Sequence, residues 1–413
     1  MQGMKDLFSY DINVRNWIYS KILGVIYAYG YTEVQTPILE KKDLFIRGIG
    51  SFSDIIAKEI YTLEGIGPKI SLRPEGTVGI GRALFENRSN NQIQDVIKVF
   101  YRGSMFRHDR PQKGRMREFT QFGCELFGIE DPIVDVEMIY MAYCLLSQLP
   151  IGDFILHINT IGNIDEREVY IKALREYFMR NISELCTLCR NRLDQNTLRI
   201  LDCKSESCKS IVEMTPNILD YLGKESSDHF NYITVELSKL KVPFIINCKL
   251  VRGLDYYNRT VFEFISHGLG SQNSIMGGGR YDSLIYKIAG INVPALGFAL
   301  GIERIELLIK MSEVKLETNS PDLTIIYMDH RGKEEINALI YSLRALGPWW
   351  IDYDYRQSSV KAQMRRANRI GAKRVVFIGE KEAQSGCAVV RDMQSREEYM
   401  WDIKNQPLGF IDK

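Results

Sequence analysis

The sequence lacks any apolar run that approaches the roughly 18 residues needed to cross a membrane, which argues against a membrane-spanning protein. Its first residues, MQGMKDLFSYD, contain no long apolar core followed by a small-residue cleavage site, so we expect a cytoplasmic protein. The sequence also has no excess of one charge sign, because it contains 53 Lys and Arg residues and 52 Asp and Glu residues, which give a net charge of +1. Any polyanion must therefore be held by local basic patches.

Internal repeats and low-complexity segments are absent as well, and the length calls for more than one core. With 413 residues, of which 45% are apolar and 25% charged, the chain has the composition of an ordinary globular protein and the length of two domains. Residues 313–322, EVKLETNSPD, are polar and end in Ser-Pro-Asp, which is typical of a linker. We therefore expect one domain over residues 1–320 and a second over residues 321–413.

The first domain has the pattern of an α+β fold. Apolar residues at helical spacing predict an amphipathic helix over residues 11–30. Short runs rich in Val, Ile, Phe and Tyr, broken by Gly and Pro, cover residues 95–128 and 244–300 and predict a mainly antiparallel sheet. Charged helical segments at about 165–240 separate these runs, which predicts a helical insertion.

Strand-like and helix-like segments alternate in the second domain. LTIIYMD, WWIDYDY and RVVFIGE predict strands, whereas KEEINALIYSLRALG and VKAQMRRANRI between them predict helices. Such alternation is typical of a parallel α/β sheet. The second domain is therefore predicted to be a smaller α/β unit.

The densest charge cluster lies in residues 106–125, FRHDRPQKGRMREFTQFGCE. Five cations flank a loop with Pro and Gly between two strand-like runs: Arg107, Arg110, Lys113, Arg115 and Arg117. Guanidinium groups in such a loop can bind phosphates through two parallel hydrogen bonds, although a solvated basic hairpin has the same composition. Gln121 and Glu125 alternate with apolar residues in the second run and should share one face of a buried strand. A buried carboxylate requires a partner.

Three further polar segments follow the insertion. Residues 249–264 combine Arg252 with acids and a Tyr-Tyr pair, which a polar strand edge could also contain. Residues 276–282, MGGGRYD, are glycine-rich but do not have the strand-to-helix setting of a dinucleotide fingerprint. Residues 297–309 predict a strand that turns into an amphipathic helix with Arg304 in its first turn, where an arginine is usually a surface residue.

The cysteines leave two alternatives open. Eight cysteines without a secretion leader indicate reduced thiols rather than disulfides. In the insertion, Cys186 and Cys189 have zinc-ligand spacing, but Cys203 and Cys208, with four residues between them, are less regular. A four-thiolate zinc site and free thiols are both compatible with this pattern, and the spacing favours free thiols. The five histidines are scattered without metal-ligand spacing.

Taken in order, these segments resemble the class II aminoacyl-tRNA synthetases, and among them the histidyl-tRNA synthetase family. GYTEVQTPILE, FRHDRPQKGR and GFALGIERI are similar to the three class motifs. LVRGLDYYNRTVFE and GGGRYD are similar to two signatures peculiar to the histidine enzymes, and SLRPEGT and TQFGCELFG agree with them. The resemblance covers nearly the whole chain. It implies an antiparallel-sheet catalytic domain with a helical insertion, followed by an α/β anticodon-binding domain.

The resemblance implies that the chain activates histidine with ATP and Mg²⁺ and loads it onto histidine tRNA. Arg107 would hold the ATP α-phosphate, while Arg304 and Phe119 would lie on opposite faces of the adenine, with Arg304 also reaching the terminal phosphates. Arg252 would contact both the histidine carboxylate and the α-phosphate. Fixed guanidinium groups would cancel the repulsion between these two anions. Asp109, also assigned to ATP, stands where the family has glutamate and is one methylene shorter.

Six more side chains are assigned to histidine by the resemblance: Glu75, Thr77, Gln121, Glu125, Tyr256 and Tyr257. The first three would receive the α-ammonium group. Glu125 and Tyr257 would bracket the two imidazole nitrogens, which offer a donor and an acceptor or two donors, so a carboxylate and a phenol suit them.

Two basic regions would contact tRNA. The loop residues Gln112, Lys113 and Arg115 would face the acceptor end. One helix of the second domain would face the anticodon arm with Lys361, Arg365, Arg366 and Arg369, although a basic helix is usually only a solvated face. The first class motif usually forms a dimer interface, so the resemblance also implies a homodimer.

Two other functions fit parts of the pattern. A catalytically inactive synthetase paralogue that serves as a regulatory subunit in histidine biosynthesis would lack the anticodon domain and parts of the signature, and both are present here. A synthetase of the same class for glycine, threonine or proline is disfavoured by the pairing of Glu125 with Tyr257.

Overall fold

The computed structural model describes residues 1–51, 53–65, 69–86, 96–314, 320–328, 333–356 and 358–408. The chain forms two compact units, Met1–Leu316 and Glu317–Lys413. Half of the predicted linker, residues 315–319, lies outside the described residues. Within the described ranges, no helix is long and apolar enough to span a membrane.

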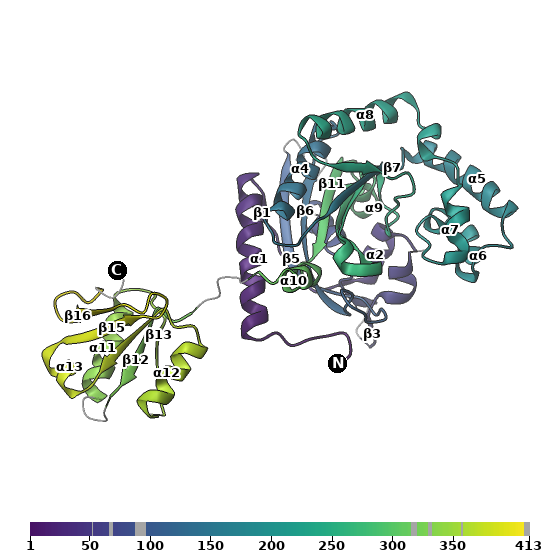
Figure 1. The fold of residues 1–413 in the computed structure, drawn as a ribbon. Coiled ribbons are helices and arrows are strands. Elements are labelled where there is room, and N and C mark those ends of the chain that lie inside the picture. The colour runs from purple at the N-terminus through teal and green to yellow at the C-terminus, as the bar shows by residue number, and fades with distance from the viewer. Residues whose placement is uncertain are drawn as a thin grey trace. The chain divides into compact units, whose positions relative to one another are not determined.

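A mainly antiparallel sheet forms the centre of the first unit (Figure 1). Over the described residues it contains eight strands in the order β1-β5-β6-β11-β10-β9-β7-β8. β1 and β8 pair in parallel with their neighbours, and the remaining pairs are antiparallel. The strands are β1 (Thr32–Glu33), β5 (Ile97–Phe106), β6 (Glu118–Phe127), β7 (Ile155–Thr160), β8 (Phe244–Ile246), β9 (Asn258–Ile265), β10 (Ser274–Arg280) and β11 (Ala295–Gly301). The predicted antiparallel sheet is confirmed.

The two faces of this sheet differ because side chains alternate along each strand. Phe122, Cys124 and Leu126 of β6 join a large apolar cluster with one set of helices: α1 (Ser9–Ala28), α4 (Ile133–Ser147), α8 (Lys224–Lys239) and α10 (Ile302–Met311). On the opposite face a second cluster includes α2 (Lys42–Ile49), α3 (Thr77–Phe85) and α9 (Leu284–Ala289). Gln121 and Glu125 have the opposite parity to Phe122 along β6, so they share this second face.

A smaller sheet contacts α2, which covers the second face. Its strands, in the order β2-β4-β3, are β2 (Leu39–Lys41), β4 (Ile70–Leu72) and β3 (Thr62–Leu63). The π-helical turn η1 (Ile55–Glu59) lies between β2 and β3 in the chain, and the 3₁₀ segment η5 (His267–Gln272) lies between β9 and β10.

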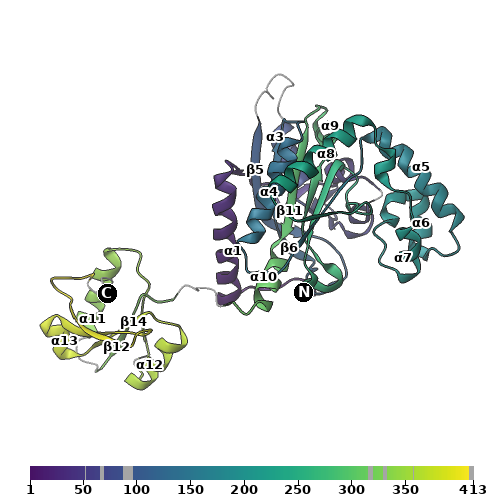
Figure 2. The same ribbon diagram turned by 45° about the horizontal axis from the view of Figure 1, so that its top comes forward.

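The helices predicted at 165–240 divide between two cores. One group has an apolar cluster of its own and consists of α5 (Ile164–Arg180), α6 (Thr187–Gln195), η3 (Thr197–Ile200), α7 (Glu206–Glu213) and η4 (Ile218–Tyr221). Both views place α5, α6 and α7 together beside the sheet, at the end away from α1 (Figures 1 and 2). By contrast, α8 packs on the main core through Phe230, Ile233 and Leu237. We call the first group, residues 164–221, the insertion module.

The second unit contains a five-stranded sheet, counted over its described residues, in the order β13-β12-β14-β15-β16. Its elements are β12 (Leu323–Tyr327), α11 (Lys333–Ala345), β13 (Ile351–Tyr353), α12 (Val360–Arg369), β14 (Arg374–Ile378), α13 (Glu380–Ser385), β15 (Cys387–Asp392) and β16 (Glu398–Asp402). β12, β13 and β14 pair in parallel, as the alternation predicts. The last two strands add an antiparallel edge that the alternation does not predict.

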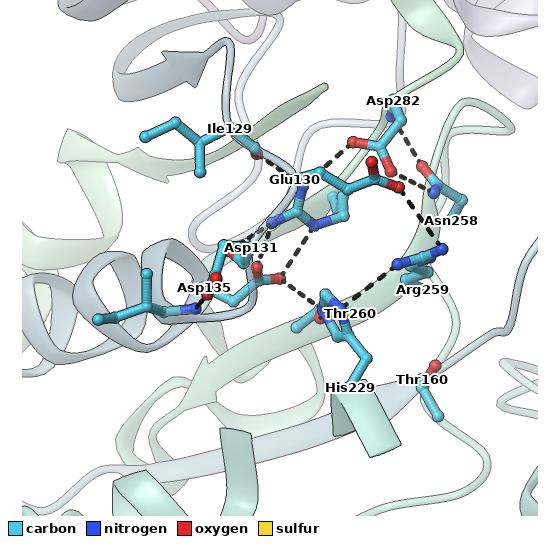
Figure 3. A network of polar contacts seen from close by, with 12 residues as sticks. Ile129, Glu130, Asp131, Asp135, Thr160, His229, Asn258, Arg259, Thr260 and Asp282 are labelled. Atoms are coloured by element: carbon cyan, nitrogen blue, oxygen red, sulfur yellow. Dashed lines mark hydrogen bonds and ion pairs between the residues drawn. The ribbon is translucent and has the colours of Figure 1, made fainter. Parts of the chain in front are cut away.

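A buried charge network around Arg280 ties the first unit together. Figure 3 labels its members Asp135, Asp282, His229 and Ile129. The Arg280 side chain at the end of β10 is 0% exposed and forms ion pairs with Asp135 of α4 and with Asp282. Arg280 Nη1 also donates to the backbone oxygen of Ile129 at 3.1 Å, and His229 Nε2 of α8 lies 3.6 Å from Asp135 Oδ1. The arginine of the GGGRYD segment therefore connects the sheet with α4 and α8.

Candidate active site

A cavity of about 550 Å³ lies against the second face of the large sheet. Its walls come from β6, β9, β10, β11, the start of α10, the loop after β5 and the segment before β9. All the residues that the resemblance assigns to ATP or histidine line it: Glu75, Thr77, Arg107, Asp109, Phe119, Gln121, Glu125, Arg252, Tyr256, Tyr257 and Arg304. The fold thus collects side chains that are far apart in the sequence.

Glu125 is the most deeply buried acid of the cavity, with 1% of its surface exposed. Thr77 Oγ1 donates to Glu125 Oε1 at 2.7 Å, and the Tyr281 hydroxyl donates to Oε2. Burial raises the pKa of Glu125 to about 8, although these two hydrogen bonds act in the opposite direction. The carboxyl group can therefore either donate or accept a proton near neutral pH.

Two glycines leave the space that Glu125 and Arg252 occupy. Gly297 pairs with Glu125 across β11 and β6, and a Cβ atom at Gly297 would overlap Glu125 Oε2. A Cβ atom at Gly277 of β10 would overlap the guanidinium group of Arg252. The glycines of the GFALG and MGGGRYD segments thus permit close approach of a charged side chain to the sheet.

Glu75 and Gln121 hold the first turn of α3. Glu75 is 2% exposed and accepts hydrogen bonds from the backbone N–H groups of Thr77 at 3.0 Å and Val78 at 2.9 Å. Gln121 Oε1 accepts from the backbone N–H of Gly76 at 2.9 Å. Burial raises the pKa of Glu75 above the usual carboxyl value. Because each carboxylate oxygen has two lone pairs, Glu75 can still accept from a ligand.

Arg107 and Arg304 are each anchored by a backbone oxygen. Arg107 Nε donates to Pro74 O at 2.9 Å, and its guanidinium carbon lies 5.2 Å from the centre of the Phe119 ring. Arg304 Nε donates to Gly114 O at 3.0 Å. Both guanidinium groups are thereby oriented before any ligand binds, which lowers the cost of reorganisation.

Arg252 has both a strong partner and a free donor. Its Nη1 donates to Glu263 Oε1 of β9 at 2.6 Å. Burial acts to lower the pKa of Arg252, but the charge of Glu263 outweighs burial and raises it above its usual value. Its buried Nε finds no hydrogen-bond partner among the described residues. A buried donor without a partner costs about 1 to 3 kcal/mol, which an anionic ligand could recover.

Two buried tyrosines that the sequence patterns do not single out complete the site. The Tyr281 hydroxyl donates to Glu125, and its ring centre lies 5.4 Å from that of Tyr256 and 6.1 Å from that of Tyr257. The Tyr101 hydroxyl donates to Gln121 Oε1 at 3.3 Å. Tyr281 lies inside the GGGRYD segment, and this position in a polar segment is the feature of the sequence that could have identified it as a site residue.

The loop between β5 and β6 neutralises part of its own charge. Arg115 pairs with Asp109 and with Glu59 Oε1, the latter at 3.3 Å. Gln112 and Arg115 exchange backbone hydrogen bonds of 3.0 and 2.9 Å, which close the loop. Gln112 and Lys113 are exposed at its tip.

In the second unit, α12 presents most of the predicted basic residues to solvent. Lys361, Arg365 and Arg369 are exposed. Arg366 is half-buried and donates to Asp352 Oδ1 of β13 at 2.9 Å, so part of its charge is used within the unit.

Comparison with known protein families assigns both units. A family model described as histidyl-tRNA synthetase matches residues 3–305, and an anticodon binding domain model matches residues 322–407. The chain belongs to the histidyl-tRNA synthetase family. The predicted arrangement of a class II catalytic domain followed by an anticodon-binding domain is thereby confirmed.

Individual members of the histidyl-tRNA synthetase family match almost the whole chain. A histidine–tRNA ligase of Desulforamulus reducens is 42% identical over 399 residues, which cover 96% of this chain and 95% of the relative. One from Geobacillus kaustophilus is 39% identical over 412 residues, with coverage of 99% and 95%. The apo structure of S. aureus histidyl-tRNA synthetase superposes with a TM-score of 0.82 at 30% identity and covers 100% of this chain and 99% of its own.

The fold alone is also shared with a protein that is named as both a regulatory subunit and a synthetase. The structure of an ATP phosphoribosyltransferase regulatory subunit/histidyl-tRNA synthetase from Bacillus halodurans superposes with a TM-score of 0.62 at 21% identity, covering 92% of this chain and 97% of its own. The greater identity and coverage of the ligases place this chain with them.

The four cysteines of the insertion module converge although they are far apart in the sequence. The spacing of Cys203 and Cys208 favours free thiols, but in the structure the sulfur atoms of Cys186, Cys189, Cys203 and Cys208 all lie within 4.8 Å of one another. Cys189 and Cys208 are fully buried.

Proposed function

We propose that this chain activates histidine with ATP and transfers it to the 3′ end of histidine tRNA. In the first step a histidine carboxylate oxygen attacks the α-phosphorus of ATP, and pyrophosphate leaves. In the second step a ribose hydroxyl at the 3′ end of the tRNA attacks the carbonyl carbon of the adenylate, and AMP leaves. The observation that carries this proposal is that Glu125 and its partners share one cavity with three anchored arginines.

Arg107, Phe119 and Arg304 would bind ATP. Arg107 would hold the α-phosphate, with Phe119 on one face of the adenine and Arg304 on the other, and Arg304 would also reach the terminal phosphates. The anchoring of both guanidinium groups by backbone oxygens supports this assignment. The assignment of Asp109 to ATP requires a rearrangement in the loop, because its carboxylate is engaged with Arg115.

Arg252 would lie between the two reacting anions. Its free Nε donor supports a contact with the histidine carboxylate or the α-phosphate, while Glu263 keeps the guanidinium in place. A fixed cation at this point offsets the repulsion between the carboxylate and the phosphate as they approach. The reaction then depends on positioning and electrostatics, without a nucleophile from the protein.

The polar floor of the cavity would recognise histidine. Glu125, which Thr77 and Tyr281 hold in place, would contact one imidazole nitrogen, and Tyr257 would contact the other. The ring of Tyr256 packs against that of Tyr257, with 4.7 Å between the ring centres. The pKa of Glu125 of about 8 supports this role, because the carboxyl can match either tautomer of the imidazole. An amino acid without these ring nitrogens would leave buried polar atoms unpaired.

The α-ammonium group would bind at the first turn of α3. Glu75 and Gln121 lie there with acceptor oxygens on the cavity wall, and Thr77 joins them to Glu125. Mg²⁺ would enter with ATP as part of the substrate. The cavity wall contains carboxylates, which are the oxygen ligands that this ion takes.

Transfer RNA would contact both units. Gln112, Lys113 and Arg115 would face the acceptor end, and the exposed Lys361, Arg365 and Arg369 of α12, together with Arg366, would face the anticodon arm. A homodimer through residues 30–40 completes the proposal. Light scattering tests the homodimer, because the mass measured in solution should be twice that of one chain.

The decisive experiment is exchange between ATP and labelled pyrophosphate, measured with each of the twenty amino acids in turn. We expect exchange that depends on histidine, followed by formation of acid-precipitable histidyl-tRNA when the tRNA is added. Exchange with another amino acid alone, or none with histidine, would refute the proposal. Absence of all exchange would instead favour the regulatory alternative.

A further inference from the structure

The insertion module has only a small core to hold its short helices. Twelve buried residues make up this core: Tyr170, Leu174, Phe178, Leu185, Cys189, Leu193, Ile200, Leu201, Cys208, Ile211, Val212 and Ile218. Units of this size bury too little apolar surface to be very stable, and many of them depend on a metal ion or disulfides. Two of the twelve core residues are cysteines, and three further cysteines, Cys186, Cys203 and Cys248, pack against this core.

The four sulfur atoms lie close enough together to bind one metal ion. All four lie within 4.8 Å of one another, and the Sγ atoms of Cys186 and Cys203 are 3.9 Å apart. Four thiolates that bind zinc at about 2.3 Å are separated from one another by roughly 3.8 Å. A disulfide would require about 2.05 Å between two sulfurs. We propose that Cys186, Cys189, Cys203 and Cys208 form a structural zinc site.

Backbone N–H groups donate to two of the four sulfur atoms. Cys189 and Cys208 are each the third residue of a short helix, α6 and α7. Cys208 Sγ accepts from the backbone N–H of Cys186 at 3.3 Å, and Cys203 Sγ accepts from the N–H of Ser205 at 3.4 Å. Such hydrogen bonds orient metal ligands and stabilise their charge.

The ligand set selects the metal and its role. The cluster contains four cysteines and no histidine or carboxylate, so it does not suit Mg²⁺ or Ca²⁺, which take oxygen ligands. Four soft sulfur ligands in a tetrahedron are typical of zinc or iron, and zinc binds more tightly than ferrous iron. Four protein ligands also leave no open position, which is the mark of a structural site.

The zinc ion would fix one wall of the cavity. Arg199, Asp202 and Lys204, which line the cavity, flank Cys203 in the chain. A hydrogen bond of 2.8 Å from Asn196 Nδ2 to Asp255 Oδ1 joins the insertion module to the segment before β9. The metal site itself does not depend on the proposed reaction.

Metal content of the full chain tests the proposal. The protein is purified under reducing conditions and dialysed, and its metal content is measured by elemental mass spectrometry. We expect one zinc ion per chain. Cys208→Ser and Cys203→Ser should each lose it, whereas Cys387→Ser in the second unit should retain it. Native mass spectrometry of the unmodified chain gives a second measurement that does not require the variants to fold.

Substitution by Co²⁺ gives a further readout of the ligands. We expect the visible absorption of tetrahedral Co²⁺ and the charge-transfer band of thiolate coordination, both absent in Cys208→Ser. A metal-free chain in which all four thiols react with iodoacetamide would overturn the proposal. So would two disulfides in the non-reduced protein, or iron with acid-labile sulfide.

Discussion

Two polar regions of the catalytic unit bury charge in different ways. Around Arg280, Asp135 and Asp282 balance the guanidinium group, and backbone oxygens take remaining N–H groups. Burial acts to raise the pKa of Asp135, but His229 and Arg280 outweigh it and hold that pKa below its usual value. In the cavity, by contrast, the pKa of Glu125 is raised to about 8 and Arg252 Nε lacks a partner among the described residues.

This difference separates a scaffold from a binding site. A network whose charges are matched within the chain gains nothing from a ligand and is strongly destabilised when one member is removed. In a site with raised carboxyl pKa values and a buried donor without a partner, burial of these polar groups costs free energy. A ligand that pairs with them can recover part of that cost. Two arginines from the two family signatures, Arg252 and Arg280, therefore have different roles.

The largest effect on stability should come from the scaffold. Arg280→Met removes the cation and leaves Asp135 buried without its main partner, so the free energy of unfolding should fall by about 3 to 5 kcal/mol. Urea unfolding measures this decrease. Asp135→Asn in the same chain should restore part of it, and a decrease below about 1 kcal/mol would contradict the scaffold role.

In the cavity, the largest effect should be on catalysis. Arg252→Ala should lower histidine-dependent exchange by about 10²- to 10³-fold, or roughly 3 to 4 kcal/mol of transition-state stabilisation, with ATP binding retained. Its unfolding free energy should change less than that of Arg280→Met. Near-normal exchange in this variant would show that Arg252 does not lie between the reacting groups.

Glu125 should give stability a pH dependence that Asp135 does not share. A folded-state pKa of about 8 against the usual 4.5 means that the folded chain keeps a proton that the unfolded chain has released. The associated stability is fully present below pH 4.5 and is lost as the pH rises to about 8, with a slope of up to about 1.4 kcal/mol per pH unit.

Glu125→Gln removes this titration. The difference in unfolding free energy between wild type and variant should therefore shift with pH across this window. The KM for histidine should rise about tenfold or more, because the carboxyl group is lost as a hydrogen-bond partner. Parallel stability curves for the two proteins would show that the Glu125 pKa is not raised.

The smallest expected effect lies outside both regions, on α12. Lys361→Ala combined with Arg365→Ala should raise the KM for tRNA a few-fold. The log–log slope of tRNA binding against salt should fall by about one unit for each phosphate that these cations neutralise. Exchange without tRNA should be unchanged. Arg391→Ala, which removes an exposed cation paired with Glu398 in the same unit, serves as the control. Equal effects of the two changes would argue against α12 as the tRNA face.

The sequence predicted the sheet and the face on which several candidate site residues lie, because both depend on local pattern. Alternation in TQFGCELFG places Gln121 and Glu125 opposite Phe122, as β6 confirms. The antiparallel strands β15 and β16 escaped prediction, because their short runs follow a regular α/β alternation and only pairing distinguishes their direction. Tyr281 was missed because a tyrosine beside Arg280 looks the same whether it packs or binds.

What the sequence determined by itself is the class of each segment and the chemistry it carries, since turns, helix spacing and glycine positions act over a few residues. Only the tertiary structure decided which groups meet. Tyr281 reaches Glu125 across 156 positions because β6, β11 and β10 are neighbours in the sheet. Likewise, the packing of α6 and α7 into one small core brings two unlike cysteine pairs into a single cluster, which their spacing alone did not indicate.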